Sequence, residues 1–298
     1  MGGSGDIPVL ELEAEAEAKI SGLLGGCGGG RFEASGVCVW HGAYYVVFDN
    51  ATWIARLNPA LQADVPGNAL FCLASGGEGY EDIAYDPRGE CFFTVVEAVE
   101  QGPEHFLAEI HELSTDFIRQ GRAPVAFPFK DDRKGLEGLS CVYRGDQRFL
   151  LGLCEGNRCK GIGDGDDVPG GGRILVLSKG AQGWRPVHTI ELPSSLHFVD
   201  YAGVDVSGER IAIVSQASSQ LWVGSFVPGT WQIADAGRVY RFPLNAKGKC
   251  IYCNVEGVAW LDANRVVVVS DKRKSGEIDK QPKRCGAKDQ SIHVFRFP

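Results

Sequence analysis

The sequence predicts an all-β fold of the β-propeller class, and three observations carry this prediction. The chain has 298 residues, of which 44% are hydrophobic and 40 are glycine. Its apolar runs are short, rich in Val, Ile, Phe and Tyr, and separated by turn residues, which is typical of β-strands. A hairpin pattern also recurs five times with a period of roughly 50 residues, which is in the range of propeller repeats.

Each hairpin consists of a first residue, then a small or acidic residue, an apolar run, a turn and a second apolar run. The five hairpins span residues 35–50, 81–98, 137–157, 202–218 and 256–272. A third strand-like segment follows each hairpin, at 52–57, 106–113, 173–178, 220–226 and 291–297. A fourth follows the first four hairpins, at 69–74, 124–129, 185–192 and 238–244. Four strands per repeat are the signature of a propeller blade.

The fifth repeat ends without a fourth strand, whereas the N-terminal segment "PVLELEAE" (8–15) is a strand-like segment left over. We therefore expect a five-bladed propeller in which the N-terminal strand completes the last blade; a six-bladed propeller is the alternative. Closing the ring in this way removes exposed strand edges. One domain is expected over residues 1–298, with residues 1–6 either disordered or a remnant of cloning.

Charge and hydropathy exclude several classes of partner. The formal net charge of −8 disfavours nucleic acid and anionic membranes. No apolar run approaches the roughly 20 residues that a membrane helix needs. The first residues lack the basic and apolar regions of a signal peptide, so a cytoplasmic location is predicted. Free thiols are then the expected state of the ten cysteines, and disulfides are the alternative.

The repeat predicts a ring of carboxylates at one end of a central channel. The first strand of a blade lines the channel and the second runs back, so the start of one and the end of the other share a face. The starting residues are Ser35, Glu81, Glu137, Ala202 and Glu256, and the closing residues are Asp49, Glu97, Glu155, Gln216 and Asp271. Glu33, Asp82 and Asp205 are further candidates for the same ring.

So many carboxylates cannot all be ionised side by side without compensation. Either several of them hold a proton, or cations lie among them. Oxygen ligands suit calcium or magnesium. The predicted metal ligands are Glu81, Glu137, Glu256, Asp49, Glu97 and Asp271. The alternative is compensation by neighbouring basic residues in salt bridges, the candidates being Lys134, Arg158, Lys160, Lys272, Arg273 and Lys274.

Acidic and basic residues at one mouth also suit a small anionic substrate such as a phosphate ester. For such a reaction we predict Glu137, Glu155 and His197 as catalytic groups. Arg158, Lys272, Arg273 and Tyr80 are the predicted substrate-binding residues.

Four cysteines form a possible structural zinc site. Cys250 and Cys253 make a C-x2-C, while Cys285 belongs to the same repeat and Cys27 to the neighbouring one in a closed ring. Four thiolates are a common zinc ligand set. One C-x2-C pair is a weak signal, and free thiols are the alternative.

The "EG-[LV]-[SA]" strand starts and the "VVVSD" strand end resemble those of the phytase-like and SdiA-regulated propeller families. They resemble more loosely the calcium-dependent gluconolactonase and paraoxonase propellers. That second resemblance implies calcium ligands at the start of inner strands, which here are Glu137 and Glu256, with Glu81 a partial match.

Three functions follow as predictions. The first is a divalent-metal-dependent hydrolase of a phosphate or other ester. The second is a glycoside hydrolase with paired carboxylates. The third is a propeller that binds a ligand or a protein without catalysis.

Overall fold

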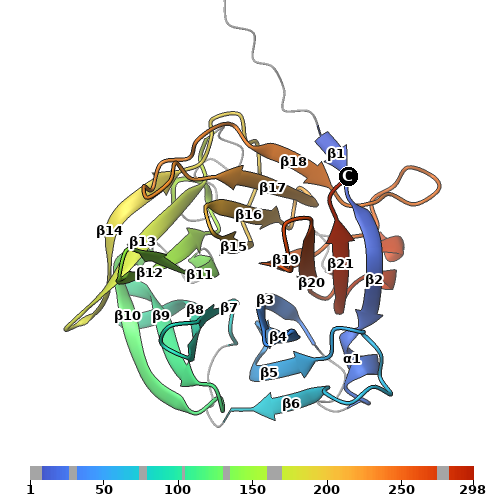
Figure 1. The fold of residues 1–298 in the computed structure, drawn as a ribbon, viewed down its shortest axis with the longest axis horizontal. Coiled ribbons are helices and arrows are strands. Elements are labelled where there is room, and N and C mark those ends of the chain that lie inside the picture. Colours follow the sequence, from blue (N-terminus) through green and yellow to red (C-terminus); the bar gives the residue numbers. More distant parts are fainter. Residues whose placement is uncertain are drawn as a thin grey trace, which may run out of the picture.

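The structure, a computed structural model, describes residues 9–26, 32–73, 79–102, 105–129, 135–159, 170–273 and 282–298. Nearly all regular structure in these residues is β-strand, and the strands form sheets arranged around a common centre (Figure 1). The chain is therefore all-β, as the sequence predicts. No helix among the described residues has the length and apolar character that a membrane crossing needs.

The strands form antiparallel units in chain order. The first contains β3 (Ala34–Trp40), β4 (Ala43–Phe48), β5 (Ala51–Leu57) and β6 (Ala69–Cys72). The second contains β7 (Asp82–Asp86), β8 (Cys91–Gly102), β9 (His105–Ser114) and β10 (Arg119–Phe129). The third contains β11 (Leu136–Arg144), β12 (Gln147–Cys154), β13 (Arg173–Gly180) and β14 (Gly183–Glu191). The fourth contains β15 (Gly203–Ser207), β16 (Arg210–Ser215), β17 (Gln220–Ser225) and β18 (Arg238–Arg241). The fifth contains β19 (Val255–Trp260), β20 (Arg265–Ser270) and β21 (Ser291–Arg296).

The N-terminal segment completes the fifth unit. β2 (Glu13–Lys19) pairs antiparallel with β21, and it overlaps the closing strand predicted at 8–15 only over residues 13–15. The segment before it behaves differently, because β1 (Val9–Glu11) pairs in parallel with β18 of the fourth unit. The N-terminus therefore joins two neighbouring units. A short helix, α1 (Ile20–Leu23), follows β2.

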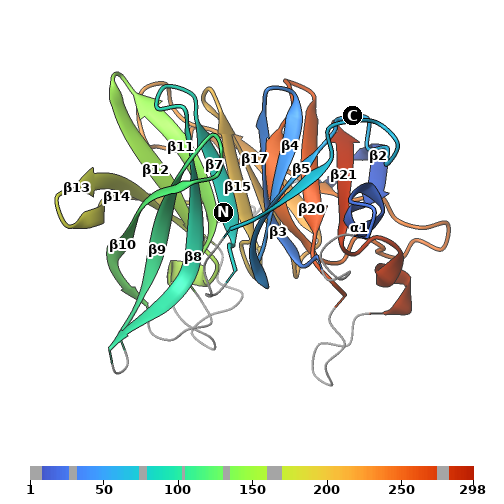
Figure 2. The same ribbon diagram turned by 90° about the horizontal axis from the view of Figure 1, so that it is seen from below.

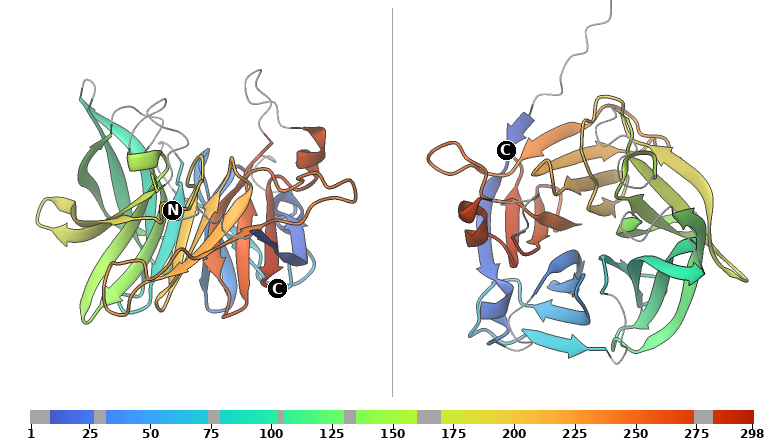
Figure 3. Two further views of the ribbon diagram at one scale, coloured as in Figure 1. Left: turned by 90° about the horizontal axis from the view of Figure 1, so that it is seen from above. Right: turned by 180° about the vertical axis from the view of Figure 1, so that it is seen from behind.

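The first strands of the units, β3, β7, β11, β15 and β19, lie next to one another in a closed ring at the centre (Figures 1 and 3). The sheets radiate from this ring and stand side by side, as the edge-on view in Figure 2 shows. Because each sheet has a neighbour on both faces, strands such as β20 are buried on both sides, and Val266 to Val269 are all 0% exposed. This explains the continuous valine run in place of an alternating pattern.

Candidate functional site: an acidic mouth of the central channel

A β-bulge at the start of the inner strands sets the position of the predicted ligands. The pairing of β11 with β12 shifts register between Leu136 and Gly138, and that of β19 with β20 shifts between Val255 and Gly257. The extra residues are Glu137 and Glu256. A bulge redirects the side chain of the extra residue, and bulges are frequent next to active sites. The recurring Glu-Gly pair is therefore a bulge followed by a close-packed residue.

Glycines at the start of β15 and β19 allow neighbouring inner strands to approach one another. A Cβ atom added to Gly203 would lie 2.3 Å from the carbonyl oxygen of Glu256, and one added to Gly257 would lie 2.8 Å from Cα of Gly36. Such distances leave no room for a side chain. The glycines thus bring the starting residues of successive units close together around the mouth.

The closing residues are fixed to the chain just before the inner strand of their own unit. The backbone N–H of Asp49 donates to the carbonyl of Glu33 at 3.0 Å, and that of Asp271 donates to the carbonyl of Asn254 at 2.8 Å. The N–H of Glu155 donates to the carbonyl of Gly135 at 3.2 Å. The repeated bond holds the end of the second strand beside the start of the first, as the sequence predicts.

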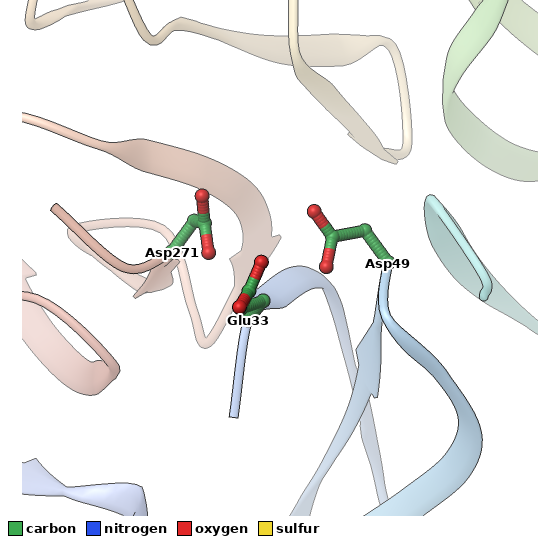
Figure 4. A group of neighbouring side chains, drawn as sticks. All are labelled: Glu33, Asp49 and Asp271. Atoms are coloured by element: carbon green, nitrogen blue, oxygen red, sulfur yellow. The ribbon is translucent and has the colours of Figure 1, made fainter. Parts of the chain in front are cut away.

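Two groups of carboxylates result. In the first, one oxygen each of Glu33, Asp49 and Asp271 lie within 4.8 Å of one another, and Figure 4 shows the three side chains directed toward a common space. In the second, oxygens of Glu97, Glu137 and Glu155 lie equally close. Each group combines two residues of one unit with one residue of a neighbouring unit. The ligand atoms are all oxygens, which fits calcium or magnesium.

Electrostatics link the two groups. Burial raises the pKa of Glu81 well above its usual range, and the neighbouring carboxylates of Glu97 and Asp49 raise it further. Burial likewise raises the pKa of Glu137, with Glu97 and Glu81 as the next causes. Glu81 also interacts with Asp271 from the first group and Glu155 from the second. Either glutamate therefore favours its protonated form, and its charged form becomes favourable only when a cation binds beside it.

The mouth also contains a buried carboxylate that the sequence reasoning missed. Asp200 is 7% exposed, accepts a hydrogen bond from the Ser215 hydroxyl at 2.5 Å and is bonded by the N–H of Ala217. It stands two residues before Ala202, as Glu33 stands two residues before Ser35. These are the two units whose starting residue is not acidic. The offset of two residues was a signal that the sequence contained.

Basic residues occur at the same mouth. Nζ of Lys272 lies 3.8 Å from Oε1 of Glu33. The backbone N–H of Arg273 donates to Asp289 at 3.1 Å. Arg158 is exposed in the short 3-10 helix Asn157–Cys159 and has a φ of 59°. Their roles in substrate binding stay predictions. Lys134, Lys160 and Lys274 lie outside the described residues.

Tyr80 and His197, predicted for substrate binding and catalysis, differ in their exposure to solvent. Tyr80 is 1% exposed, and its hydroxyl lies 3.2 Å from Nδ1 of His111 in the interior, so its burial does not fit the predicted contact with substrate. His197 is exposed, and its neighbour Phe198 accepts a hydrogen bond from the Asn157 side chain at 3.4 Å. This places the His197 segment beside the loop that follows Glu155, and its catalytic role stays a prediction.

Asp82 and Asp205, candidates for the ring, instead bind the edges of inner strands. Asp82 accepts from the N–H of Leu139 at 2.8 Å, and Asp205 accepts from the N–H of Trp260 at 2.8 Å. Burial raises the pKa of Asp205 to about 6. The inner strand of each unit has no strand partner on its channel side, so these carboxylates supply the acceptors that its N–H groups need. Their role is structural.

The cysteines differ from the prediction. Disulfides join Cys154 to Cys159 and Cys253 to Cys285, so these four are not free thiols. The second bond removes two thiolates from the predicted zinc set, because a sulfur in a disulfide is not a thiolate ligand. Cys250 remains free, and Cys27 lies outside the described residues.

A glycoside hydrolase also needs aromatic rings near its carboxylates on which a sugar can stack, and Trp40, Trp53 and Trp260 are the tryptophans to compare with this requirement. Trp40 and Trp260 are the last residues of β3 and β19, at the end of the channel opposite to the carboxylates. Trp53 packs on Phe32, with ring centres 6.3 Å apart. No observation of the mouth therefore favours sugar chemistry over the other predictions.

Comparison with known proteins supports the fold class. No family model and no curated protein matches the chain. The crystal structure of glutaminyl cyclase from Myxococcus xanthus is similar over 97% of this chain and 98% of that chain, with a TM-score of 0.54 and 8% identity. The PQQ-bound aldose sugar dehydrogenase of Streptomyces coelicolor is similar over 97% and 99%, with a TM-score of 0.50 and 11% identity.

These similarities are distant and concern the fold alone. The chain has the β-propeller type of fold, and the resemblance to phytase-like proteins has no match at family level. Function is therefore argued from the mouth itself.

Proposed function

We propose that the protein is a five-bladed β-propeller that binds a divalent cation, calcium or magnesium, at the acidic mouth and hydrolyses a small anionic ester there. Five blades are supported by the antiparallel units β3–β6, β7–β10, β11–β14, β15–β18 and β19–β21 with β2, whose inner strands close one ring. The second and third of these units also join into one eight-stranded sheet, because β10 pairs in parallel with β14 at Val125 and Trp184. The proposal of a cation rests on Glu97, Glu137 and Glu155, whose carboxylates each place one oxygen within 4.8 Å of the others.

The chemistry of the donors supports a hard cation. Carboxylates of the mouth raise one another's pKa values, which means that adding positive charge lowers the free energy of the folded state. A bound cation polarises an ester or phosphoryl oxygen and acidifies a bound water. Glu137 or Glu155 would then serve as ligand or as general base. Lys272 and Arg273, beside the first carboxylate group, are suited to hold the anionic part of the substrate.

The test is cation binding followed by activity. Protein stripped with EDTA should gain several degrees in melting temperature with calcium or magnesium, because a ligand that binds only the folded state stabilises it. Elemental analysis of the purified protein identifies the metal that it retains. Hydrolysis of nitrophenyl phosphates and carboxylic esters should then depend on the same metal.

Glu209→Gln is a matched control, because Glu209 is a carboxylate of the opposite channel end, paired with Arg144 at 2.9 Å. Its metal response should equal that of the wild type. A melting temperature indifferent to EDTA, calcium and magnesium would refute the proposal. Metal binding without turnover of any ester would leave a cation-binding propeller and refute the hydrolase.

A further inference from the structure

Three sulfur atoms lie together beside the fifth unit. Sγ of Cys250 lies 3.9 Å from Sγ of Cys253, and Cys253 forms the disulfide with Cys285. Among the free cysteines of the described residues, Cys250 is the one whose thiol lies in contact range of a disulfide. The others, Cys38, Cys72, Cys91 and Cys141, belong to β-strands. The arrangement is that of an attacking thiol next to the bond that it can break.

The geometry points to a thiol–disulfide exchange site formed by Cys250, Cys253 and Cys285. The thiolate of Cys250 attacks Sγ of Cys253, a Cys250–Cys253 bond forms and the Cys253–Cys285 bond breaks. Cys285 leaves as a thiolate and takes up the proton that Cys250 has lost. The step consumes no oxidant or reductant and converts one disulfide isomer into the other.

The surroundings of the sulfurs suit this exchange. Nε of Arg284 donates to the carbonyl oxygen of Cys250 at 2.8 Å, so a cation adjoins both the attacking and the leaving residue. Cys250 and Cys253 are partly exposed, whereas Cys285 is 1% exposed. The attacking sulfur is therefore accessible to base, and the leaving sulfur is shielded from external thiols.

Exchange would change how the acidic mouth is anchored. Cys253 directly precedes Asn254, whose side chain donates to the carbonyl of Lys272 at 2.7 Å and whose carbonyl accepts from Asp271. In one isomer this segment is covalently tied to the short 3-10 helix Lys283–Ala287 through Cys285. In the other, Cys250 and Cys253 are joined within the segment and the helix is released. The exchange site thus acts on a part of the mouth, whatever the mouth binds.

The experiment is disulfide mapping of the intact chain. The protein is incubated near neutral and at alkaline pH without reductant, acid-quenched, alkylated with N-ethylmaleimide and digested for mass spectrometry. We expect both isomers in the wild type: Cys253–Cys285 with alkylated Cys250, and Cys250–Cys253 with alkylated Cys285. Their interconversion should be faster at the higher pH, because the thiolate is the attacking species.

Variants separate exchange from artefact. Cys250→Ser should retain Cys253–Cys285 as its only bond among these residues and fold normally, and Cys285→Ser should contain Cys250–Cys253. Cys72→Ser, which removes an exposed free thiol elsewhere, should exchange like the wild type. Finding only Cys253–Cys285 in the wild type at every pH would overturn the proposal. Alkylation of all three thiols, with or without bound zinc, would overturn it too.

Discussion

Buried carboxylates at the two ends of the central channel have pKa values shifted in opposite directions. At the mouth, burial and neighbouring carboxylates raise the pKa values of Glu81 and Glu137. At the other end, Asp86 is 0% exposed and lies 2.7 Å from the Arg148 guanidinium. Burial alone would raise the pKa of Asp86, but hydrogen bonds from Arg148 and other groups outweigh it and lower the pKa.

The difference teaches that burial does not decide the charge of a carboxylate. Tyr143 also donates to Asp86 at 2.9 Å, so the opposite end fixes an anion with side chains of the protein. At the mouth, several carboxylates of the protein lie close together instead, so binding a cation or a proton there lowers the free energy of the folded state. The predictions below act on this contrast.

The largest expected effect is at the opposite end. Arg148→Met removes the guanidinium and leaves the buried Asp86 without its charged partner, which should lower the free energy of unfolding by about 3 kcal/mol. Urea denaturation at neutral pH measures it. The double variant with Asp86→Asn should recover much of the loss; equal instability of the single and double variants would contradict the ion-pair explanation.

At the mouth, Glu137→Gln should weaken calcium or magnesium binding by more than about tenfold, since loss of even an outer-shell partner of a metal has at least that effect. Isothermal titration calorimetry measures the affinity. In EDTA the same variant should be at least as stable as the wild type, because it removes one of several mutually repelling charges. A variant that is destabilised without metal and binds metal normally would contradict the assignment of Glu137.

The pH dependence should also distinguish the two ends. Because the pKa values of Glu81 and Glu137 are raised above 4.5 in the folded state, the folded state holds more protons than the unfolded state above that pH. In EDTA their contribution to the free energy of unfolding therefore falls as pH rises above 4.5.

The pKa of Asp86 is lowered from 3.8, so its contribution is present above that pH and lost only as pH falls below it. Denaturant titrations across this pH range, with EDTA or with calcium, measure both contributions. Calcium should cancel the decline, because metal replaces protons at the mouth. In EDTA, the double variant Glu81→Gln, Glu137→Gln should lack the decline, and its persistence there would contradict the origin that we assign to it.

The smallest effect is expected from Lys272→Gln. Lys272 is 41% exposed at the side chain and lies 3.8 Å from Glu33, so the free energy of unfolding should change by less than about 1 kcal/mol. Cation affinity should stay equal or rise slightly, while the KM for an anionic ester should increase. An unchanged KM would exclude Lys272 from substrate binding.

The sequence by itself determined the strands, their grouping and the face on which Asp49, Glu137 and Asp271 meet. These follow from local periodicity and from the rule that consecutive antiparallel strands return to the same edge. The N-terminal closing strand was predictable for the same reason, since the last repeat lacks one strand. The division of that segment between β18 and β21 was not predictable, because it depends on which of two open edges each residue meets.

Only the tertiary structure decided which side chains share a space. The bulges that redirect Glu137 and Glu256 are register shifts between two strands, and the Glu-Gly pair alone does not show how its strand is paired. The burial of Tyr80 against His111 and the use of Asp82 as an acceptor for Leu139 depend on neighbouring units. The approach of Cys285 to Cys253 spans 32 residues and both sides of a hairpin. Contacts of this kind arise from packing between units, which residue spacing along the chain does not encode.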